Sequence, residues 1–402
     1  MNTTIQPLKG FRDFLPIEAA KRKWLREKLA AICESWGFEP LETPTLEPLE
    51  LFTGQIGEDE KLFFKFKDQG DRDVALRYDQ TVPTCRVIGQ YKNTLTFPFK
   101  RYQIQPAFRA EKPQKGRYRE FTQVDADIFG DTSPMADAET IALSLDIYRQ
   151  LGFQKAVVRI NSRDLFKGIP YEAITAIDKL KKIGEDGVLK EMEGKGISLT
   201  QAKAYLTQVK NAEPNEAIQT ILSYLKNYGF NEEWYVFDPT IARSFAYSTG
   251  PIWEVEIPEY GNASVLGGER YDGMLTKIAG FMGGGTGFGL GFDRTLEAME
   301  ACGLLTSDVQ NNFVLVTVFS KDTLRESLTI AQKIRDSGLN TSVYTTPGDK
   351  LEKQLKYADK KGIPYVLIQG PEEIAKGVVQ MKNMKTREAK LLSLEAVIRE
   401  LR

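Results

Sequence analysis

The first hydrophobic pattern along the chain has the period of an amphipathic helix. Between residues 16 and 36 the large apolar side chains fall close to one helix face: Trp24, Leu25, Leu29, Ile32 and Trp36. Pro16 suits the first turn and Gly37 suits the end. The pattern therefore predicts a helix over 16–36 that packs on a core through this face.

Short patterns typical of strands follow this helix. They cover residues 62–68, 74–79, 99–105 and 117–130, and a strand-like stretch ends at Pro44. A second helix is predicted over 135–152 and a strand over 155–161. Strand patterns return at 252–257 and 288–292, and a helix follows them. The mixture predicts a core in which helices cover a sheet.

Two changes in composition and hydrophobic pattern divide the chain. Residues 165–235 are rich in Lys, Glu, Ala and Leu with helical spacing, which predicts an inserted helical module. After a polar linker at 303–312, strand and helix patterns alternate as βαβαβ, which is typical of a small α/β domain. We therefore predict a core formed by 1–164 and 236–302, interrupted by the helical insertion, and a separate domain at 313–402.

The absence of histidine narrows the possible chemistry most. Without a histidine in 402 residues, the chain can build no Ser-His-Asp or Cys-His nucleophile and no imidazole metal site. Its three cysteines, Cys33, Cys85 and Cys302, lie far apart, which argues against a disulfide framework or a zinc knuckle. Catalysis must therefore use carboxylates, arginines and backbone groups, and any metal ion must have oxygen ligands.

The chain shows no membrane or export signal. No stretch approaches 18 apolar residues, and the segment MNTTIQPLKGFRDFLP resembles neither a signal peptide nor a lipidation site. Together with free cysteines, this favours a cytoplasmic protein without a membrane partner.

Charge is unevenly placed on a chain whose net charge is −1. Residues 313–402 carry 16 Lys/Arg and 11 Asp/Glu, a net of +5. Residues 100–119 carry seven Lys/Arg against Glu111 alone, a net of +6. Two local basic zones suit a polyanion bound at two places. Solvated charged faces remain the alternative.

A glycine track is the first candidate for chemistry. In FMGGGTGFGLGFDRT, glycine occupies every second position from 283 to 291, which puts all five on one face of a strand. Such a face is a floor on which a flat ligand can lie, and Arg294 in the next helix could close over a ring or grip a phosphate. A flexible loop is the alternative.

The segment PAFRAEKPQKGRYREFTQVDADIFG is the second candidate. It predicts a hairpin with Arg109 and Glu111 on the same side of one leg. Arg109 could bind an α-phosphate bidentately and Phe121 could stack on a base. Alternating Arg119, Gln123 and Asp127 would share a polar face, although a charged surface hairpin is also possible.

Two weaker candidates complete the set. Asp79 and Thr81, two apart in ALRYDQTVP, would lie on one strand face, where a carboxylate and a hydroxyl could receive an ammonium group. Arg243 and Arg270 each precede turn-like, aromatic-rich sequence. All four could equally be structural.

Together these segments resemble the class II aminoacyl-tRNA synthetases, specifically the histidyl-tRNA synthetases, nearly end to end. ETPTLEPLELF with Pro44 resembles motif 1, the FRAE–RYREF hairpin motif 2, and GGGTGFGLGFDR motif 3. LRYDQT, the spacing of Gln123 and Asp127, the Arg243 segment and GGERYDG are more specific likenesses. The resemblance implies an α/β fold of the α+β kind: an antiparallel sheet flanked by helices, an inserted helical domain, and a C-terminal α/β anticodon-binding domain.

The resemblance implies ATP as a substrate and a role for each residue at the nucleotide. Arg109 would bind the α-phosphate, Glu111 and Phe121 the adenine, and Arg294 the far side of the nucleotide. Arg243 would be the catalytic arginine that stabilises the pentavalent transition state. Adenylation is an in-line displacement that needs positioning and charge neutralisation, so arginines, carboxylates and Mg²⁺ suffice without a dedicated protein metal site.

The resemblance also implies a site for L-histidine. Asp79, Thr81 and Gln123 would hold its amino group and Asp127 would accept the imidazole N–H. Tyr247 is assigned to the same pocket.

Further partners follow from the resemblance. Gln114 would read the extra 5′ guanosine of the histidine tRNA, and motif 1 would form a homodimer interface.

Three positions depart from the family pattern. Where the family usually shows R-G-L-D-Y-Y-T-G, this chain has RSFAYSTG, so that Ala246 replaces an aspartate and Ser248 replaces a tyrosine that contacts the imidazole. Glu269 replaces a glycine in GGERYDG. For the lost tyrosine, Tyr247 or Tyr271 could substitute, water could bridge, or the pocket could accept another amino acid.

The favoured function is that of a histidine–tRNA ligase. One alternative is the non-catalytic, synthetase-like regulatory subunit of ATP phosphoribosyltransferase, and another is a tRNA-binding module without catalysis. Residues 313–402, Arg243 and the basic hairpin loop favour the ligase over the regulatory subunit. The complete set of ATP-facing residues disfavours the binding module.

Overall fold

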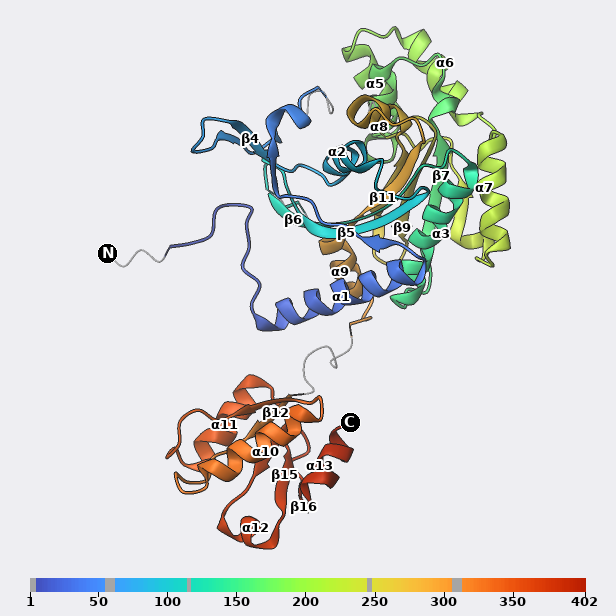
Figure 1. Cartoon of the computed structure of the whole chain (residues 1–402). Helices are drawn as coiled ribbons and strands as arrows, with labels where there is room; N and C mark the ends of the chain where they lie inside the picture. The colour runs from blue at the N-terminus through green and yellow to red at the C-terminus, as the bar shows by residue number, and fades with distance from the viewer. Residues whose placement is uncertain (1–4, 55–61, 114–116, 244–247, 306–312) are drawn as a thin grey trace. The chain divides into compact units, whose positions relative to one another are not determined.

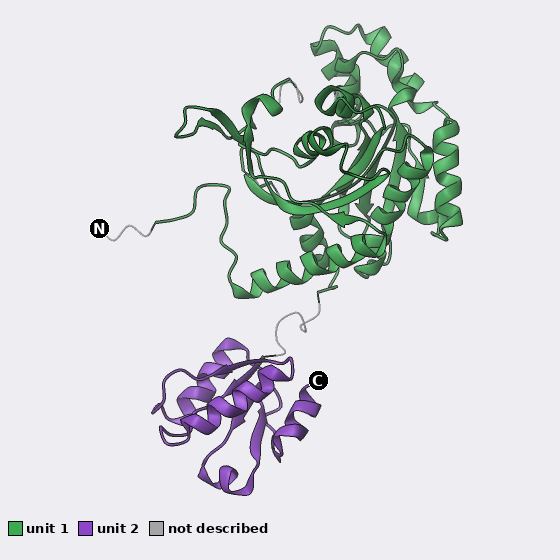
Figure 2. Ribbon diagram, viewed as in Figure 1, with its two compact units in different colours: residues 1–305 green, residues 306–402 purple. Residues whose placement is uncertain are grey.

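An eight-stranded sheet organises the larger of two structural units (Figures 1 and 2). The computed structural model describes residues 5–54, 62–113, 117–243, 248–305 and 313–402. The chain consists of two compact units, Met1–Leu305 and Thr306–Arg402. Among the described residues, no helix has both the length and the apolar character that a membrane span requires.

The strands of the large sheet are mostly antiparallel. Their order is β1 (Glu39–Pro40), β5 (Phe99–Phe108), β6 (Glu120–Phe129), β11 (Gly285–Gly291), β10 (Gly261–Arg270), β9 (Pro251–Ile257), β7 (Val157–Ser162) and β8 (Tyr235–Phe237). Only the outer pairs, β1–β5 and β7–β8, are parallel. The predicted antiparallel sheet is therefore confirmed.

Helices cover both faces of this sheet (Figure 1). The helices α1 (Pro16–Ser35), α3 (Pro134–Gln150) and α9 (Phe292–Ala301) share the largest hydrophobic core with the sheet. In α1, Leu25, Leu29 and Ile32 are buried, at the spacing that the sequence predicted. On the concave side, α2 (Thr81–Tyr91) and α8 (Asp272–Ala279) form a second cluster.

The segment predicted as a helical insertion contains α4 (Tyr171–Ile177), α5 (Leu180–Gly194), α6 (Leu199–Lys210) and α7 (Glu216–Asn227). Helices α4 to α6 form a third hydrophobic cluster, which also includes Ile252 of β9. In contrast, α7 buries Ile218, Ile221 and Leu225 in the main core. The last helix of the segment is thus part of the sheet's covering layer.

Two smaller sheets complete the fold. The strands β2 (Leu46–Pro48), β4 (Asp73–Leu76) and β3 (Lys65–Lys67) form a three-stranded antiparallel sheet, and the short helix η1 (Leu49–Leu51) follows β2. In the C-terminal unit the order is β13 (Asn340–Val343), β12 (Phe313–Val316), β14 (Tyr365–Ile368), β15 (Val379–Asn383) and β16 (Ala389–Leu392).

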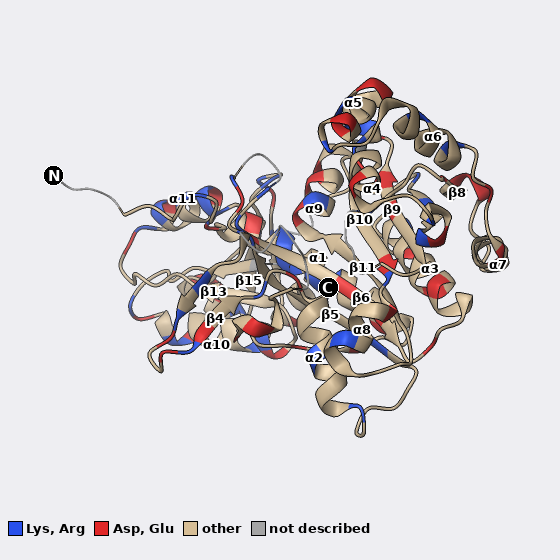
Figure 3. Ribbon diagram, turned by 90° about the horizontal axis from the view of Figure 1, so that it is seen from above, with Lys and Arg blue, Asp and Glu red and all other residues tan. Residues whose placement is uncertain are grey.

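The C-terminal unit begins with the predicted βαβαβ order. Its first three strands are parallel, and α10 (Leu324–Asp336) and α11 (Leu351–Lys361) connect them. The rest consists of α12 (Pro371–Lys376), the hairpin β15–β16 and α13 (Leu394–Leu401). Basic side chains recur along α11, where Lys353, Lys356, Lys360 and Lys361 lie (Figure 3).

Two local predictions are wrong. Strand β4 ends at Leu76 and Thr81 begins helix α2, so Asp79 and Thr81 do not share a strand. The β-branched residues of α2 mimic a strand, but tertiary burial favours the helix, and Pro83 sits in the first turn, where its missing N–H is tolerated. The second error concerns the sequence after Arg270, which was predicted to be turn-like: Arg270 ends strand β10 and helix α8 begins at Asp272.

Candidate active site

The glycine track of β11 forms the floor of the site. Gly287, Gly289 and Gly291 pair with Asp127, Asp125 and Gln123 on β6, so all six positions face the same side of the sheet. A Cβ on Gly287 would lie 2.1 Å from Oδ1 of Asp127. The track is therefore glycine because neighbouring side chains lie across it. Gly283 precedes the strand, which begins at Gly285, so the predicted run of five on one strand is shortened to four.

A cavity of about 370 Å³ opens above this floor. Its lining includes nine of the eleven predicted site residues: Asp79, Thr81, Arg109, Glu111, Phe121, Gln123, Asp127, Arg243 and Arg294. They come from segments that are far apart in the sequence and meet over the central strands. The other two, Gln114 and Tyr247, lie outside the described residues, as does Ala246.

Arginines and aromatic rings are among the residues that line the cavity. Arg109 and Glu111 follow β5, which ends at Phe108, so they lie beyond the strand on which they were predicted. The guanidinium carbon of Arg109 is 4.2 Å from the ring centroid of Tyr78 and 5.1 Å from that of Phe121. In the first turn of α9, Arg294 donates to the carbonyl oxygen of Ser264 at 2.8 Å. Cations beside a flat aromatic face suit a nucleotide.

The predicted basic zone at 100–119 is partly neutralised. Arg101 is buried in the sheet and forms an ion pair with Asp127. Lys100 forms an ion pair with Glu139, and Arg117 lies 3.1 Å from Glu111. The alternation of a strand, which buries every second side chain, explains why Arg101 does not contribute to a surface patch.

Asp127 is held between two partners. Its Oδ1 accepts a hydrogen bond from the hydroxyl of Tyr271 at 2.5 Å, and its Oδ2 lies 2.6 Å from Nη2 of Arg101. Burial raises the pKa of Asp127, and the charge of Arg101 opposes that rise. Since Tyr271 already donates to Asp127, the two residues form one unit in the wall of the cavity.

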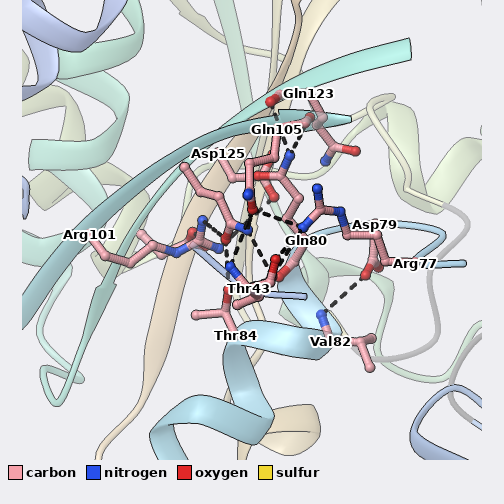
Figure 4. A network of polar contacts seen from close by, with 12 residues as sticks. Thr43, Arg77, Asp79, Gln80, Val82, Thr84, Arg101, Gln105, Gln123 and Asp125 are labelled. Atoms are coloured by element: carbon pink, nitrogen blue, oxygen red, sulfur yellow. Dashed lines mark hydrogen bonds and ion pairs between the residues drawn. The ribbon is translucent and has the colours of Figure 1, made fainter. Parts of the chain in front are cut away.

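A buried polar network lies beside Gln123 and includes Arg101, the ion-pair partner of Asp127 (Figure 4). The amide of Gln80 donates to the backbone oxygens of Gln105 and Gln123, at 2.8 and 3.1 Å. Arg77 donates to the side chain of Gln105 and to the backbone oxygen of Thr43, both at 2.8 Å. These residues were not predicted from the sequence, although polar residues alternate at 101, 103 and 105 of β5.

Asp79 lies at the start of α2. Its Oδ1 accepts from the backbone N–H of Val82 at 3.2 Å. Burial raises the pKa of this carboxyl to about 6, and Arg109 acts in the opposite direction. The carboxylate and the neighbouring Thr81 both line the cavity, which supports a site for an ammonium group.

Arg243 lies across β10 on the other side of the glycine track. Its Nε is 3.3 Å from Oε1 of Glu269, and its Nη1 is 3.9 Å from Oε1 of Glu254. A Cβ on Gly267 would lie 2.0 Å from Nη1, so this glycine makes room for the guanidinium. The structural alternative holds for Arg270, because this residue forms a buried ion pair with Asp137 at 2.9 Å.

The departures at 248 and 269 are in direct contact. The buried hydroxyl of Ser248 donates to Oε2 of Glu269, which lies opposite Gly287 on β10. In the sequence these residues are two separate departures from the family pattern. Their positions, 21 residues apart in the sequence, gave no signal that they meet.

Comparisons with known proteins agree with this architecture. Residues 10–184 match the family model described as "Histidyl-tRNA synthetase", and residues 313–402 match "Anticodon binding domain". The chain is 36% identical to the histidine–tRNA ligase of Cytophaga hutchinsonii, over 98% of both proteins. It is also 36% identical to that of Rhodopirellula baltica, over 96% of this chain and 95% of the relative.

Solved structures give the same result. The histidyl-tRNA synthetase of Nostoc sp. PCC 7120 superposes with a TM-score of 0.85 at 26% identity, covering 100% of this chain and 99% of that one. A Bacillus halodurans C protein, titled as an ATP phosphoribosyltransferase regulatory subunit/histidyl-tRNA synthetase, has a TM-score of 0.72 at 22% identity, over 92% of this chain and 99% of that one, which concerns the fold alone. Sequence, fold and site agree, and the chain belongs to the histidyl-tRNA synthetase family.

Proposed function

We propose that this protein is a ligase that attaches histidine to its cognate tRNA. In the first step, a carboxylate oxygen of histidine attacks the α-phosphorus of ATP and pyrophosphate leaves. In the second, a hydroxyl at the tRNA 3′ end attacks the carbonyl carbon of the adenylate and AMP leaves. The observation that carries the proposal is the convergence of nine candidate residues on one cavity.

The residues that line the cavity fall into two sets, one for ATP and one for the amino acid. Arg109 and Arg294 would neutralise the phosphates, and Phe121 and Glu111 would hold the adenine. Arg243 would meet the charge that develops on the α-phosphoryl group, an effect worth roughly 10²–10³-fold for one well-placed donor. No nucleophilic side chain is needed, which suits a histidine-free chain.

The second set of residues would hold the amino acid. Asp79, Thr81 and Gln123 would receive its ammonium group, and the fixed carboxylate of Asp127 would accept an imidazole N–H. A charge-assisted hydrogen bond of this kind is about twice as strong as a neutral one. Tyr247 and Gln114 keep their proposed roles in the amino-acid pocket and at the tRNA.

Magnesium fits the site as a partner of the ATP phosphates. Among the described residues, no group of three or more Cys, Asp or Glu side chains could hold a metal ion. Mg²⁺ is commonly held by one or two carboxylates plus substrate phosphates. Glu254, which lines the cavity and whose pKa burial raises, would supply such a ligand. The ion would neutralise phosphate charge.

The remaining proposals concern assembly and tRNA. The segment 313–402, with its net charge of +5, would bind the anticodon region of the tRNA. We also propose a homodimer through motif 1, supported by Leu46 and Phe66, which are 40% and 49% exposed on the small sheet. A cytoplasmic location and the domain boundaries at 165, 236, 303 and 313 complete the proposal.

Transfer of radiolabelled histidine to histidine tRNA tests the function directly. We expect charging that depends on ATP and Mg²⁺. If the protein were instead the regulatory subunit, it would not charge tRNA, and its addition would change the activity of an ATP phosphoribosyltransferase.

A further inference from the structure

Glu269 makes an unusual contact for a residue in a nucleotide-binding site. It lies on β10 directly opposite Gly287, and its side chain is only 8% exposed. One carboxylate oxygen accepts from the hydroxyl of Ser248, and the other lies 3.3 Å from Nε of Arg243. A buried acidic residue beside an arginine that is to meet phosphate charge needs a reason, because it opposes phosphate binding.

The surroundings of Arg243 supply that reason. Its guanidinium lies against Gly267, where no side chain of that residue can support it. The carboxylate of Glu254 on β9 is more distant from Arg243, at 3.9 Å. An arginine side chain has many rotamers, and a donor helps a transition state only when its position is set beforehand.

We propose that Glu269, itself held by Ser248, is a positioning residue for Arg243. The ion pair engages Nε, the guanidinium nitrogen nearest the main chain, and so helps to set the plane of the group above Gly267 on β10. This inference rests on the proposed function, in which Arg243 acts on the α-phosphoryl group. It also makes Ser248 and Glu269 one functional unit, in which the serine orients the carboxylate.

A double-mutant cycle tests the proposal by ATP–pyrophosphate exchange. Glu269→Gln keeps the size of the side chain and removes its charge, so kcat should fall roughly 10- to 100-fold with little change in the KM for ATP or amino acid. Arg243→Ala should lower kcat roughly 10²–10³-fold. In the Arg243→Ala background, Glu269→Gln should have no further effect, because it acts only through that arginine.

Equal losses in both backgrounds would overturn the proposal. So would an unchanged kcat, or a loss confined to the KM for the amino acid, since Glu269 would then contact the substrate itself. Ser248→Ala should lower kcat less than Glu269→Gln does. A larger effect of Ser248→Ala would contradict the proposal that the serine acts on Arg243 through Glu269.

Glu256→Gln is the matched control. Glu256 is also buried and ion-paired, to Arg159 and Lys181, and lies two residues beyond Glu254 on β9. It should leave kcat unchanged in both backgrounds. Denaturant unfolding of every variant separates misfolding from lost positioning. The proposal would be contradicted if the effects of the two substitutions were non-additive in the free energy of unfolding but additive in kcat.

The wild-type protein separates this inference from the proposed function. If it activates an amino acid other than histidine, the proposed function fails, and the cycle is run with that amino acid. If it activates none, both fail.

Discussion

At the scale of single residues, the cavity holds its carboxylates in different ways. Asp127 has a hydroxyl and a guanidinium as partners, whereas Asp79 has one backbone N–H within hydrogen-bond distance. Burial favours the neutral form of a carboxyl group that has no strong partner for its charge. The two residues should therefore differ in how substitution and pH affect them.

Asp127 should determine recognition of the amino-acid side chain. In Asp127→Asn the amide can still accept from Tyr271, but the charge that strengthens the imidazole contact is lost. We expect kcat/KM for histidine to fall roughly 100-fold, measured by pyrophosphate exchange, with the KM for ATP unchanged. Ser248→Ala should change the KM for histidine only mildly. A similar KM in Asp127→Asn and the wild type would remove Asp127 from the recognition site.

Asp79 should make stability depend on pH. Its pKa is raised to about 6 in the folded protein, above the unfolded value of about 3.9. The folded state therefore binds the extra proton between these values, and this group lowers the free energy of unfolding as pH rises from about 4 to about 6. Asp79→Asn should remove that loss, on the order of 3 kcal/mol at pH 7, while weakening amino-acid binding. Urea unfolding at several pH values measures the effect, and an identical pH profile for variant and wild type would contradict it.

At the scale of secondary-structure elements, the sequence predicts those with strong periodicity. The helix over 16–36, the hairpin of β5 and β6, and the alternation from 313 onward are confirmed within a few residues. Helix α2 was missed because its β-branched residues suit a strand, and only packing decides. The polar network of Gln80 and Gln105 was missed because it forms between separate segments. The contact of Ser248 with Glu269 depends on tertiary structure in the same way.

The glycine track makes a prediction at this scale. Gly287→Ala would place a Cβ 2.1 Å from Oδ1 of Asp127 and 2.5 Å from the backbone oxygen of Ala126, so β6 and β11 must shift. We expect a loss of roughly 1–3 kcal/mol in stability and a strong loss of pyrophosphate exchange. Gly194→Ala is the control, because that exposed helical position has open space around it. If the two variants unfold alike, the close packing of the track is wrong.

At the scale of the whole molecule, the two units should divide the two steps. Residues 313–402 have hydrophobic clusters of their own, and the described lining of the cavity comes from residues 79–294. A truncated chain of residues 1–305 should therefore retain pyrophosphate exchange, while the KM for tRNA in charging rises. Equal losses of both activities in a folded truncation would mean that the C-terminal unit supports the active site.

The central claim is that this cavity activates histidine. The most direct measurement is ATP–pyrophosphate exchange by the full chain with each of the twenty amino acids in turn, since exchange reports the adenylate without requiring tRNA. We predict exchange with histidine and none above background with the other nineteen. Exchange with a different amino acid would show that Ser248 and Glu269 have changed the substrate, and exchange with none would contradict the assignment of a catalytic synthetase.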